Sequence, residues 1–225
     1  MSLRLQDRVA VITGAGSGIG LASVRRLAAE GAAVVAVDID EEAGKAAAAE
    51  VRGEFVAAHV SAEDDSILDT GLDAWLRVQQ VNLTSVYLCC KHVIPYMRRQ
   101  GRGSIINTAS FVAVLGAATS QISYTASKGG VLALSRELGV QFAREGIRVN
   151  ALCPGPVNTP LLRELFAADP ERAQRRLVHV PMGRFAEAEE IAAAVAFLAS
   201  DDASFITAST FLVDGGISGA YVTPQ

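Results

Sequence analysis

Short apolar runs alternate with longer helical stretches along most of the 225-residue chain. The apolar runs are rich in Val, Ile and Ala and carry few charges, which is typical of strands buried on both faces of a parallel sheet. Helical spacing fills the stretches between them, and the first such stretch ends at Gly31. The predicted strands lie within residues 8–16, 32–40, 54–60, 103–110, 147–155 and 209–216. The predicted helices cover residues 20–31, 41–52, 74–100, 121–145 and 186–199.

This alternation predicts an α/β fold with a doubly wound, mostly parallel sheet and helices on both faces, a Rossmann fold. The chain has no long linker, low-complexity block or internal repeat, so we expect a single domain over residues 1–225. In such a domain the binding site lies at the carboxyl ends of the strands.

Composition narrows the classes of partner. Half of the residues are hydrophobic, enough for a large core, and the net charge of −4 gives no basic surface for nucleic acid or an anionic membrane. The longest apolar runs, such as residues 192–199, are too short to span a bilayer. A strand pattern starts near the N-terminus with no signal peptide ahead of it. We therefore expect a cytoplasmic protein that binds a small molecule, not nucleic acid or a membrane.

Neither the cysteines nor the histidines show the spacing of a metal site. The chain has three cysteines in apolar surroundings, typical of reduced thiols in a cytosolic core or interface: Cys89, Cys90 and Cys153. Its three histidines are scattered: His59, His92 and His179. We expect no metal.

A glycine-rich turn, "TGAGSGIG", spans Thr13 to Gly20 between the first predicted strand and its helix. Gly14, Gly18 and Gly20 allow a tight turn, close approach to a phosphate and close packing of the helix, whose N-terminus then faces the anion. A lone glycine triplet is weak evidence, but its strand–turn–helix context predicts a dinucleotide site.

Asp38 ends the second predicted strand, eighteen residues after Gly20. A carboxylate there can accept the hydroxyls of the adenine ribose and would repel a 2′-phosphate. The alternative is a helix N-cap, because Asp40 and Glu41 follow. The ribose interpretation is favoured, and no Lys or Arg lies in the glycine turn or directly after Asp38. The sequence therefore predicts NAD in preference to NADP.

Tyr124 and Lys128 stand four residues apart in "YTASK", on one face of a predicted helix. They are either a surface pair or a catalytic acid whose pKa the neighbouring ammonium lowers. Ser110 closes a predicted strand fourteen residues before Tyr124, and Asn82 lies within the long predicted helix of residues 74–100.

With these motifs the chain resembles the short-chain dehydrogenase/reductase family. The matching features are the glycine turn, the Asn of "VNL", the strand-end Ser, YxxxK, "CPGPVNTP" at 153–160 and "VDGG" at 213–216. The closest likeness is to 3-oxoacyl-[acyl-carrier-protein] reductases and sugar or polyol dehydrogenases. The resemblance implies an NAD-dependent oxidoreductase that interconverts a secondary alcohol and a ketone by hydride transfer.

The resemblance also implies a catalytic tetrad of Asn82, Ser110, Tyr124 and Lys128. Tyr124 would exchange a proton with the substrate oxygen, and Ser110 would hydrogen-bond that oxygen. Lys128 would hold the nicotinamide ribose and favour the phenolate, and Asn82 would anchor a water that relays protons from Lys128. Ser110 lies one residue further from Tyr124 than is common in the family, which an inserted loop residue accommodates.

For the cofactor, the resemblance implies contacts from residues of the glycine turn, the second strand, the tetrad and the "CPGPVNTP" segment. They are Gly14, Ser17, Gly18, Ile19, Gly20, Asp38, Tyr124, Lys128, Pro154, Gly155, Val157 and Thr159. Thr159 would contact the nicotinamide carboxamide, or simply cap the helix that starts at Pro160, and both roles are compatible.

Residues 160–182 have the pattern of two short amphipathic helices, which we interpret as a lid over the substrate. Four apolar residues there either line the pocket or pack the lid down: Leu161, Leu162, Leu165 and Phe166. The family resemblance further implies a homotetramer in which residues 74–100 and 121–145 pack between subunits.

One family feature is missing near residues 61–66. A helix, a strand and their loops, roughly 25–35 residues by ordinary element lengths, are absent there. A true deletion would pair the strand ending at Ser110 with the strand Val9–Thr13 and shift Ser110 by about 4.8 Å. Alternatively, the chain as written omits residues, which the family register resuming at Ser66 favours. Position 59 also holds His in place of the family's Asp.

Two other functions remain open. A catalytically silent dinucleotide-binding protein of the same fold would fit the missing segment. A sugar-nucleotide epimerase or dehydratase is more distant, because the region after Lys128 leaves little room for a sugar-nucleotide domain.

Overall fold

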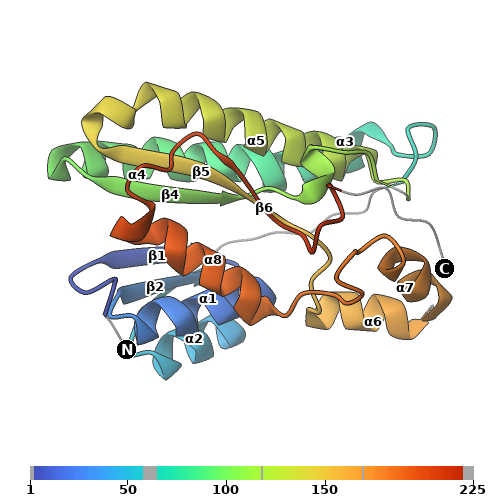
Figure 1. The fold of residues 1–225 in the computed structure, drawn as a ribbon, viewed down its shortest axis with the longest axis horizontal. Helices are drawn as coiled ribbons and strands as arrows, with labels where there is room; N and C mark the ends of the chain where they lie inside the picture. The colour runs from blue at the N-terminus through green and yellow to red at the C-terminus, as the bar shows by residue number, and fades with distance from the viewer. Residues whose placement is uncertain (1–2, 58–64, 118, 169, 220–225) are drawn as a thin grey trace. The chain divides into compact units, whose positions relative to one another are not determined.

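The computed structural model describes residues 3–57, 65–117, 119–168 and 170–219 (Figure 1). The chain divides into two compact units, each with its own parallel sheet. The first unit consists of Met1–His59, Gly155–Asp202 and Val213–Gln225. The second unit consists of Val60–Pro154 and Ala203–Leu212.

The sheet of the first unit has three parallel strands in the order β1 (Val9–Thr13), β2 (Ala33–Asp38) and β3 (Glu54–Ala57). Thr13 lies opposite Val37, so the carboxyl ends of β1 and β2 are level. A site that uses the residues after both strands can therefore form at this edge.

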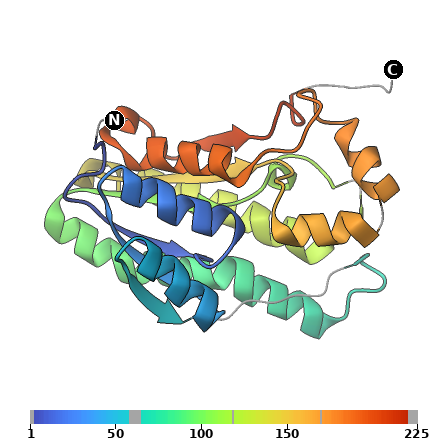
Figure 2. The ribbon, with the colours of Figure 1, turned by 90° about the horizontal axis from the view of Figure 1, so that it is seen from below.

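Helices α1 (Gly18–Ala29) and α8 (Ala188–Ala199) of the first unit run side by side (Figure 2), and α2 (Glu41–Glu50) packs on β2 and β3. Their small apolar faces bury two groups of side chains against the sheet. One is centred on Ala15, Val24, Val34, Ala36 and Ala48, the other on Leu5, Leu27 and Ala196.

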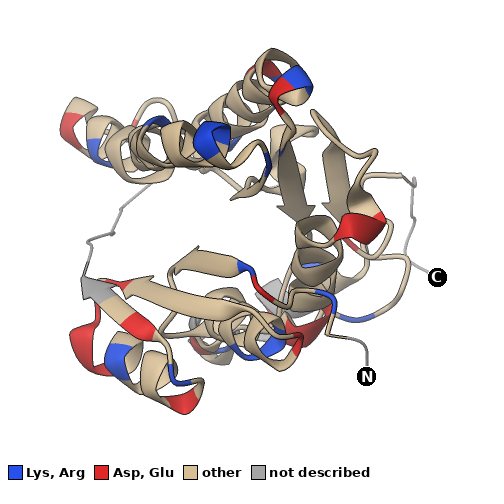
Figure 3. Ribbon diagram, turned by 90° about the vertical axis from the view of Figure 1, so that its left-hand side faces the viewer, with Lys and Arg blue, Asp and Glu red and all other residues tan. Residues whose placement is uncertain are grey.

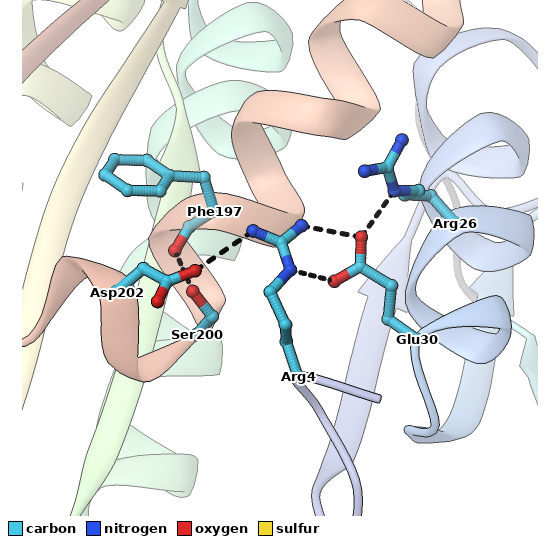
Figure 4. Close-up of polar contacts among 6 residues, drawn as sticks. All are labelled: Arg4, Arg26, Glu30, Phe197, Ser200 and Asp202. Atoms are coloured by element: carbon cyan, nitrogen blue, oxygen red, sulfur yellow. Dashed lines mark hydrogen bonds and ion pairs between the residues drawn. The ribbon is translucent and has the colours of Figure 1, made fainter. Parts of the chain in front are cut away.

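Ion pairs connect the N-terminal segment of the first unit to two of its other elements (Figure 4). The guanidinium of Arg4 donates to both carboxylate oxygens of Glu30, at 2.8 and 2.7 Å, and to Asp202 at 3.2 Å. Arg26 also donates to Glu30, at 2.6 Å. The carboxylate of Glu30 is only 10% exposed, so these partners offset its desolvation.

Two short helices, α6 (Pro160–Ala168) and α7 (Pro170–Leu177), occupy the segment predicted to hold two helices. The side chains of three proposed lid residues lie outside the described ones: Leu161, Leu165 and Phe166. Whether the lid residues line a pocket stays a prediction.

The second unit has the strand order β4 (Gly103–Thr108), β5 (Ile147–Pro154) and β6 (Thr210–Val213), with β4 and β5 parallel. Strand β5 is almost entirely buried, as expected of a central strand. Charged residues gather on helices and turns, whereas β1 and β4 hold none (Figure 3).

The long helix predicted for residues 74–100 starts slightly earlier and is interrupted. It consists of α3 (Leu72–Gln79), a π-helical segment η1 (Gln80–Thr84) and α4 (Ser85–Gln100). Helix α5 (Ile122–Gln141) packs against α3, η1, β4 and β5. Short 3₁₀ turns lie at η2 (Phe111–Ala113), η3 (Ala143–Glu145) and η4 (Asp201–Ala203).

All predicted strands and helices are present, and the α/β fold class is confirmed. The strands nevertheless form two sheets of three, and in the described part of the chain β1 pairs only with β2 and β4 only with β5. The prediction that a deletion would pair β4 with β1 is therefore wrong. Each strand takes its ladder hydrogen bonds from a neighbour within its own sheet.

The interpretation that residues were omitted near 61–66 stays a prediction. Residues 58–64, which include His59, lie outside the described residues. No helix in the described ranges is both long and apolar enough to cross a membrane.

Candidate active site

The glycine turn between β1 and α1 depends on backbone conformations that only glycine adopts easily. Gly14 has φ +67° and Gly18 φ +50°, both left-handed. A Cβ on Gly20 would lie 1.7 Å from the carbonyl oxygen of Gly14, so no side chain fits there. Ser17 is the N-cap of α1 and makes no side-chain cap bond, and Ile19 lies in the first helical turn. The turn thus places the N-terminus of α1 at the carboxyl end of β1, as an anion site requires.

The side chain of Asp38 is hydrogen-bonded to the backbone of this turn. Its carboxylate accepts the N–H of Gly16 at 2.7 Å and the N–H of Asp40 at 3.0 Å. The N-cap of α2 is Asp40, which accepts from Ala43 N–H at 3.0 Å, so Asp38 does not have the alternative capping role. Its negative charge lies beside the proposed phosphate turn, where an added phosphate would be repelled.

The segment after β5 lies against the glycine turn within the first unit. The Gly155 N–H donates to Val213 C=O at 2.9 Å, and Val157 is buried. A Cβ on Gly18 would meet the Thr159 methyl at 3.3 Å, so these residues are neighbours. The Thr159 hydroxyl also accepts the N–H of Leu162 at 3.3 Å, which is N-cap behaviour. Thr159 therefore caps α6 beside the turn.

Three members of the proposed tetrad meet at the carboxyl end of β4. The buried hydroxyl of Ser110 forms a side-chain hydrogen bond with Tyr124, in the first turn of α5. The Lys128 Nζ donates to the carbonyl oxygen of Thr108 at 2.9 Å and lies 5.6 Å from the centroid of the Tyr124 ring. The longer loop between Ser110 and Tyr124 therefore preserves their contact.

Desolvation dominates the acid–base properties of this cluster. It lowers the pKa of Lys128 from 10.5 to about 8, partly offset by an electrostatic interaction with Cys153. It also raises the pKa of Tyr124 above its ordinary value, partly offset by the hydrogen bond with Ser110. Burial therefore raises the pKa of Tyr124 in the chain by itself, and the prediction that Lys128 and a bound nicotinamide together favour the phenolate stays a prediction.

Asn82 lies in the π-helical segment η1, where sequence alone predicted a regular helix. Its side-chain NH₂ donates to the Ser127 hydroxyl at 3.1 Å, and that hydroxyl donates to the carbonyl oxygen of Tyr124 at 2.7 Å. Sequence reasoning missed the roles of Ser127 and Thr108. The signal for Ser127 was its position between Tyr124 and Lys128, but nothing in the sequence pointed to the contact with Asn82.

Each unit gathers its own part of the predicted site. The first unit holds Gly14, Ser17, Gly18, Ile19, Gly20, Asp38, Gly155, Val157 and Thr159, and the second holds Asn82, Ser110, Tyr124, Lys128 and Pro154. Among the residues that the structure describes, no three His, Cys, Asp or Glu side chains gather as metal ligands.

Two family models match the chain. One, described as short chain dehydrogenase, matches residues 8–71, and the other, described as enoyl-(acyl carrier protein) reductase, matches residues 54–218. Together they extend over both units.

Characterised relatives match nearly end to end. Levodione reductase of Leifsonia aquatica is 37% identical over 259 positions, with 97% of each chain covered. Cis-4-hydroxycyclohexanecarboxylate dehydrogenase of Sinomonas cyclohexanicum is 40% identical, with 93% of this chain and 96% of the relative covered. A crystal structure from Beutenbergia cavernae, described as an NAD(P)-dependent gluconate 5-dehydrogenase with NADP bound at low occupancy, is 30% identical. The two structures superpose with a TM-score of 0.91, and the match covers 98% of this chain and 100% of the other.

The alignment with levodione reductase also locates a difference in length. Its 259 positions exceed the 225 residues of this chain, so at least 34 of them face a gap here. The two family models overlap at residues 54–71, the region where the sequence lacks a predicted helix and strand. Despite this gap, the matches cover nearly the whole sequence, and the chain belongs to the short-chain dehydrogenase/reductase family.

Proposed function

We propose that this protein interconverts secondary alcohols and ketones with NAD, using Tyr124 as the acid and base. The observation that carries the proposal is the contact between Tyr124 and Ser110 at the carboxyl end of β4, with the Lys128 ammonium beside the phenol ring. A phenol, a hydroxyl and an ammonium in this arrangement are suited to bind and protonate a substrate oxygen.

The raised pKa of Tyr124 keeps its proton in place at neutral pH. In ketone reduction the phenol then donates this proton to the forming alkoxide, while Ser110 hydrogen-bonds the same oxygen. Lys128 is anchored to Thr108 by one N–H, which leaves other donors for ribose hydroxyls. Bound NAD supplies the hydride chemistry, and the protein supplies orientation and proton transfer.

The glycine turn and Asp38 fit a dinucleotide with a free 2′-hydroxyl. The turn excludes side chains where a pyrophosphate must approach the backbone, and each Asp38 oxygen that accepts one N–H retains a lone pair for a ribose hydroxyl. The charge of Asp38 favours NAD over NADP, although the related Beutenbergia structure holds NADP. Comparing the KM for the two cofactors tests this preference.

The substrate class we propose is an alcohol on a saturated ring. The support is the 40% identity to a dehydrogenase named for cis-4-hydroxycyclohexanecarboxylate. An apolar pocket suits such a ring, while Tyr124 and Ser110 handle its single oxygen.

We also propose a cytoplasmic homotetramer that uses α4 and α5. Large side chains on these helices are exposed in the single chain, with Tyr96 63% and Val140 72% accessible. Exposed apolar patches of this kind mark protein interfaces. None of the three cysteines forms a disulfide, which is in keeping with a reducing compartment. Sedimentation of the purified protein tests the tetramer.

A second candidate is a dinucleotide-binding protein without turnover. The difference in length favours this candidate, because at least 34 positions of the alignment with levodione reductase face a gap in this chain. A family member can lose catalytic geometry while its glycine turn still binds nucleotide, because catalysis tolerates smaller displacements than binding does.

The test mixes the purified protein with NAD⁺ and a panel of secondary alcohols that includes cyclohexanol, and follows the absorbance of reduced nicotinamide. If the wild-type protein reduces NAD⁺ and the Tyr124→Phe variant does not, the result supports the dehydrogenase. NAD⁺ binding without turnover of any alcohol supports the silent protein and contradicts the main proposal.

A further inference from the structure

Lys128 differs from the other two lysines of the chain in its surroundings. Lys45 pairs with Glu41 at 2.8 Å and its side chain is 61% exposed, and Lys91 is exposed on α4. Lys128 is only partly exposed, and among the residues that the structure describes no carboxylate acts on its amine. The amine of Lys128 therefore loses water without gaining an anion in return.

This loss of water makes the neutral amine of Lys128 abundant near neutral pH. Desolvation lowers its pKa to about 8, and the interaction with Cys153 offsets this only in part. At pH 8 about half of the molecules then carry a neutral amine, compared with roughly 0.4% for an unperturbed lysine. The Tyr124 ring centroid, at 5.6 Å, is close to the limit of about 6 Å at which a ring attracts an ammonium, so it opposes the shift weakly.

The hydrogen bond of Lys128 leaves its nucleophilic lone pair available. The Nζ donates to the carbonyl oxygen of Thr108 at 2.9 Å, and a backbone carbonyl can only accept. The bond therefore uses an N–H and fixes the place of the amine. In the neutral form, the lone pair stays open to a carbon electrophile, as in lysines that react with carbonyl compounds.

A proton donor lies beside this amine in the same unit. Tyr124 precedes Lys128 by one turn of α5, and burial raises the pKa of its phenol, which therefore stays protonated at pH 8. A side-chain hydrogen bond with Ser110 holds the phenol in place. Condensation of an amine with a carbonyl compound needs both groups, because the carbonyl oxygen must be protonated before it leaves.

We propose that Lys128 is a covalent site for small aliphatic aldehydes, which it binds reversibly as an imine with Tyr124 as the proton donor. The Nζ lone pair bonds to the carbonyl carbon, and the carbonyl oxygen leaves as water. The two protons of this water are those that the nitrogen gives up, passed through Tyr124, so the phenol is regenerated. The step needs no nicotinamide, oxidant or reductant, and the inference does not rest on the proposed hydride transfer.

Reductive trapping tests the proposal on the full chain without nucleotide. The protein is mixed at pH 8 with acetaldehyde and an excess of sodium cyanoborohydride, which reduces each imine to a stable secondary amine, so that imine formation limits the rate. Peptide mass spectrometry then compares the three lysines. Lys128 is expected to be ethylated about tenfold faster than Lys45 and Lys91. Equal rates at the three lysines, or a slower rate at Lys128, overturn the proposal.

The pH profile of trapping gives a second readout. The rate at Lys128, relative to that of Nα-acetyllysine in the same mixture, is expected to fall as the pH rises above about 8, because the amine of Lys128 is then already mostly neutral. The titratable groups that face this amine are Tyr124 on its own helix and Cys153 on β5. A relative rate that stays constant from pH 7 to pH 10 contradicts the proposal.

A pair of tyrosine variants tests the proton donor. Tyr124→Phe is expected to slow the ethylation of Lys128 by about tenfold and to leave Lys45 and Lys91 unchanged. Tyr96→Phe is the matched control, because this tyrosine is exposed on α4, and it should react as the wild type does. Equal ethylation of Lys128 in Tyr124→Phe and wild type overturns the assignment of the proton to Tyr124.

The proposed function and this inference fail separately. A protein that oxidises no alcohol but is ethylated fastest at Lys128 contradicts the dehydrogenase and supports the imine site. A protein that oxidises cyclohexanol but is ethylated equally at all three lysines supports the dehydrogenase and overturns the imine site.

Discussion

The carboxyl ends of β1 and β4 hold their candidate site residues by different means, each within its own unit. After β1, the backbone forms the site: left-handed glycines, a position where no Cβ fits and the N-terminus of α1, closed by the one carboxylate of Asp38. After β4, side chains from several elements form it, with Ser110, Tyr124 and Lys128 joined through hydrogen bonds and ring contact. A backbone site needs local conformation alone, whereas a side-chain site needs the packing of a whole unit.

The two regions are therefore expected to fail independently. A change at the glycine turn should remove nucleotide binding, and a change at the phenol should remove proton transfer. Both strands are edges of their own sheets in the described part of the chain, so neither sheet requires the other strand for its ladder.

The largest expected effect follows from Tyr124→Phe. Without the phenol, no group at the end of β4 exchanges the substrate proton, and kcat is expected to fall by about 10³-fold. NAD⁺ affinity, measured by calorimetry, should change little because the glycine turn is untouched. A variant that keeps more than about a tenth of wild-type kcat would remove Tyr124 from the mechanism.

Gly20→Ala tests the other region. The added methyl would overlap the Gly14 carbonyl oxygen, so the turn must shift, at a cost of about 1–3 kcal/mol. NAD⁺ affinity is expected to fall roughly 10- to 100-fold by calorimetry. Gly129→Ala is the matched control, because a Cβ there meets no atom within 4 Å. Equal affinity in Gly20→Ala and wild type would show that the turn does not hold the nucleotide.

Asp38→Asn is expected to change cofactor preference. The amide keeps the shape but removes the charge that repels a 2′-phosphate, so the ratio of kcat/KM for NAD⁺ over NADP⁺ should fall by about tenfold. Steady-state kinetics with each cofactor measure this ratio. An unaltered ratio would assign the preference to other residues.

Arg4→Ala should lower the free energy of unfolding by about 1 kcal/mol. The variant removes the bidentate ion pair of Arg4 with Glu30, which then keeps only its bond from Arg26 (Figure 4). Urea denaturation measures the loss. The control is Arg25→Ala, which breaks a solvent-exposed pair with Glu50 and should cost less. A larger loss in the control would contradict the role assigned to burial at Glu30.

The last prediction concerns a pH dependence of stability at the end of β4. The pKa of Lys128 is about 8 in the folded protein, below its ordinary value of 10.5, so the unfolded chain binds more protons between these two pH values. Stability should therefore rise with pH from about 8 towards 10, and Lys128→Met should lack this rise. Above pH 10 the raised pKa of Tyr124 acts in the opposite direction. Parallel curves for both proteins, from urea denaturation at each pH, would contradict the lowered pKa.

Sequence was informative for the two regions to different extents. The glycine turn and Asp38 could be recognised because their function depends on local backbone and on adjacent residues. Tyr124 and Lys128 could be paired because helical spacing places them on one face. The helices, strands and fold class followed from hydrophobic periodicity.

Features that depend on contacts between elements could not be predicted. The π-helical segment at Asn82 and its bond to Ser127 depend on how η1 packs against α5. The direction of the pKa shift at Tyr124 depends on how much water the fold removes from the phenol. The division into two sheets depends on which strands pair in the folded chain, and local sequence patterns did not specify these pairings.

Isotope transfer tests the central claim most directly. Wild-type protein is incubated with NAD⁺ and cyclohexanol that carries deuterium on the carbinol carbon, and the reduced cofactor is analysed by mass spectrometry. The account predicts one deuterium per reduced nicotinamide, because that hydrogen moves as hydride while Tyr124 takes the hydroxyl proton. Unlabelled reduced cofactor, or no reduced cofactor from protein that binds NAD⁺, would contradict it.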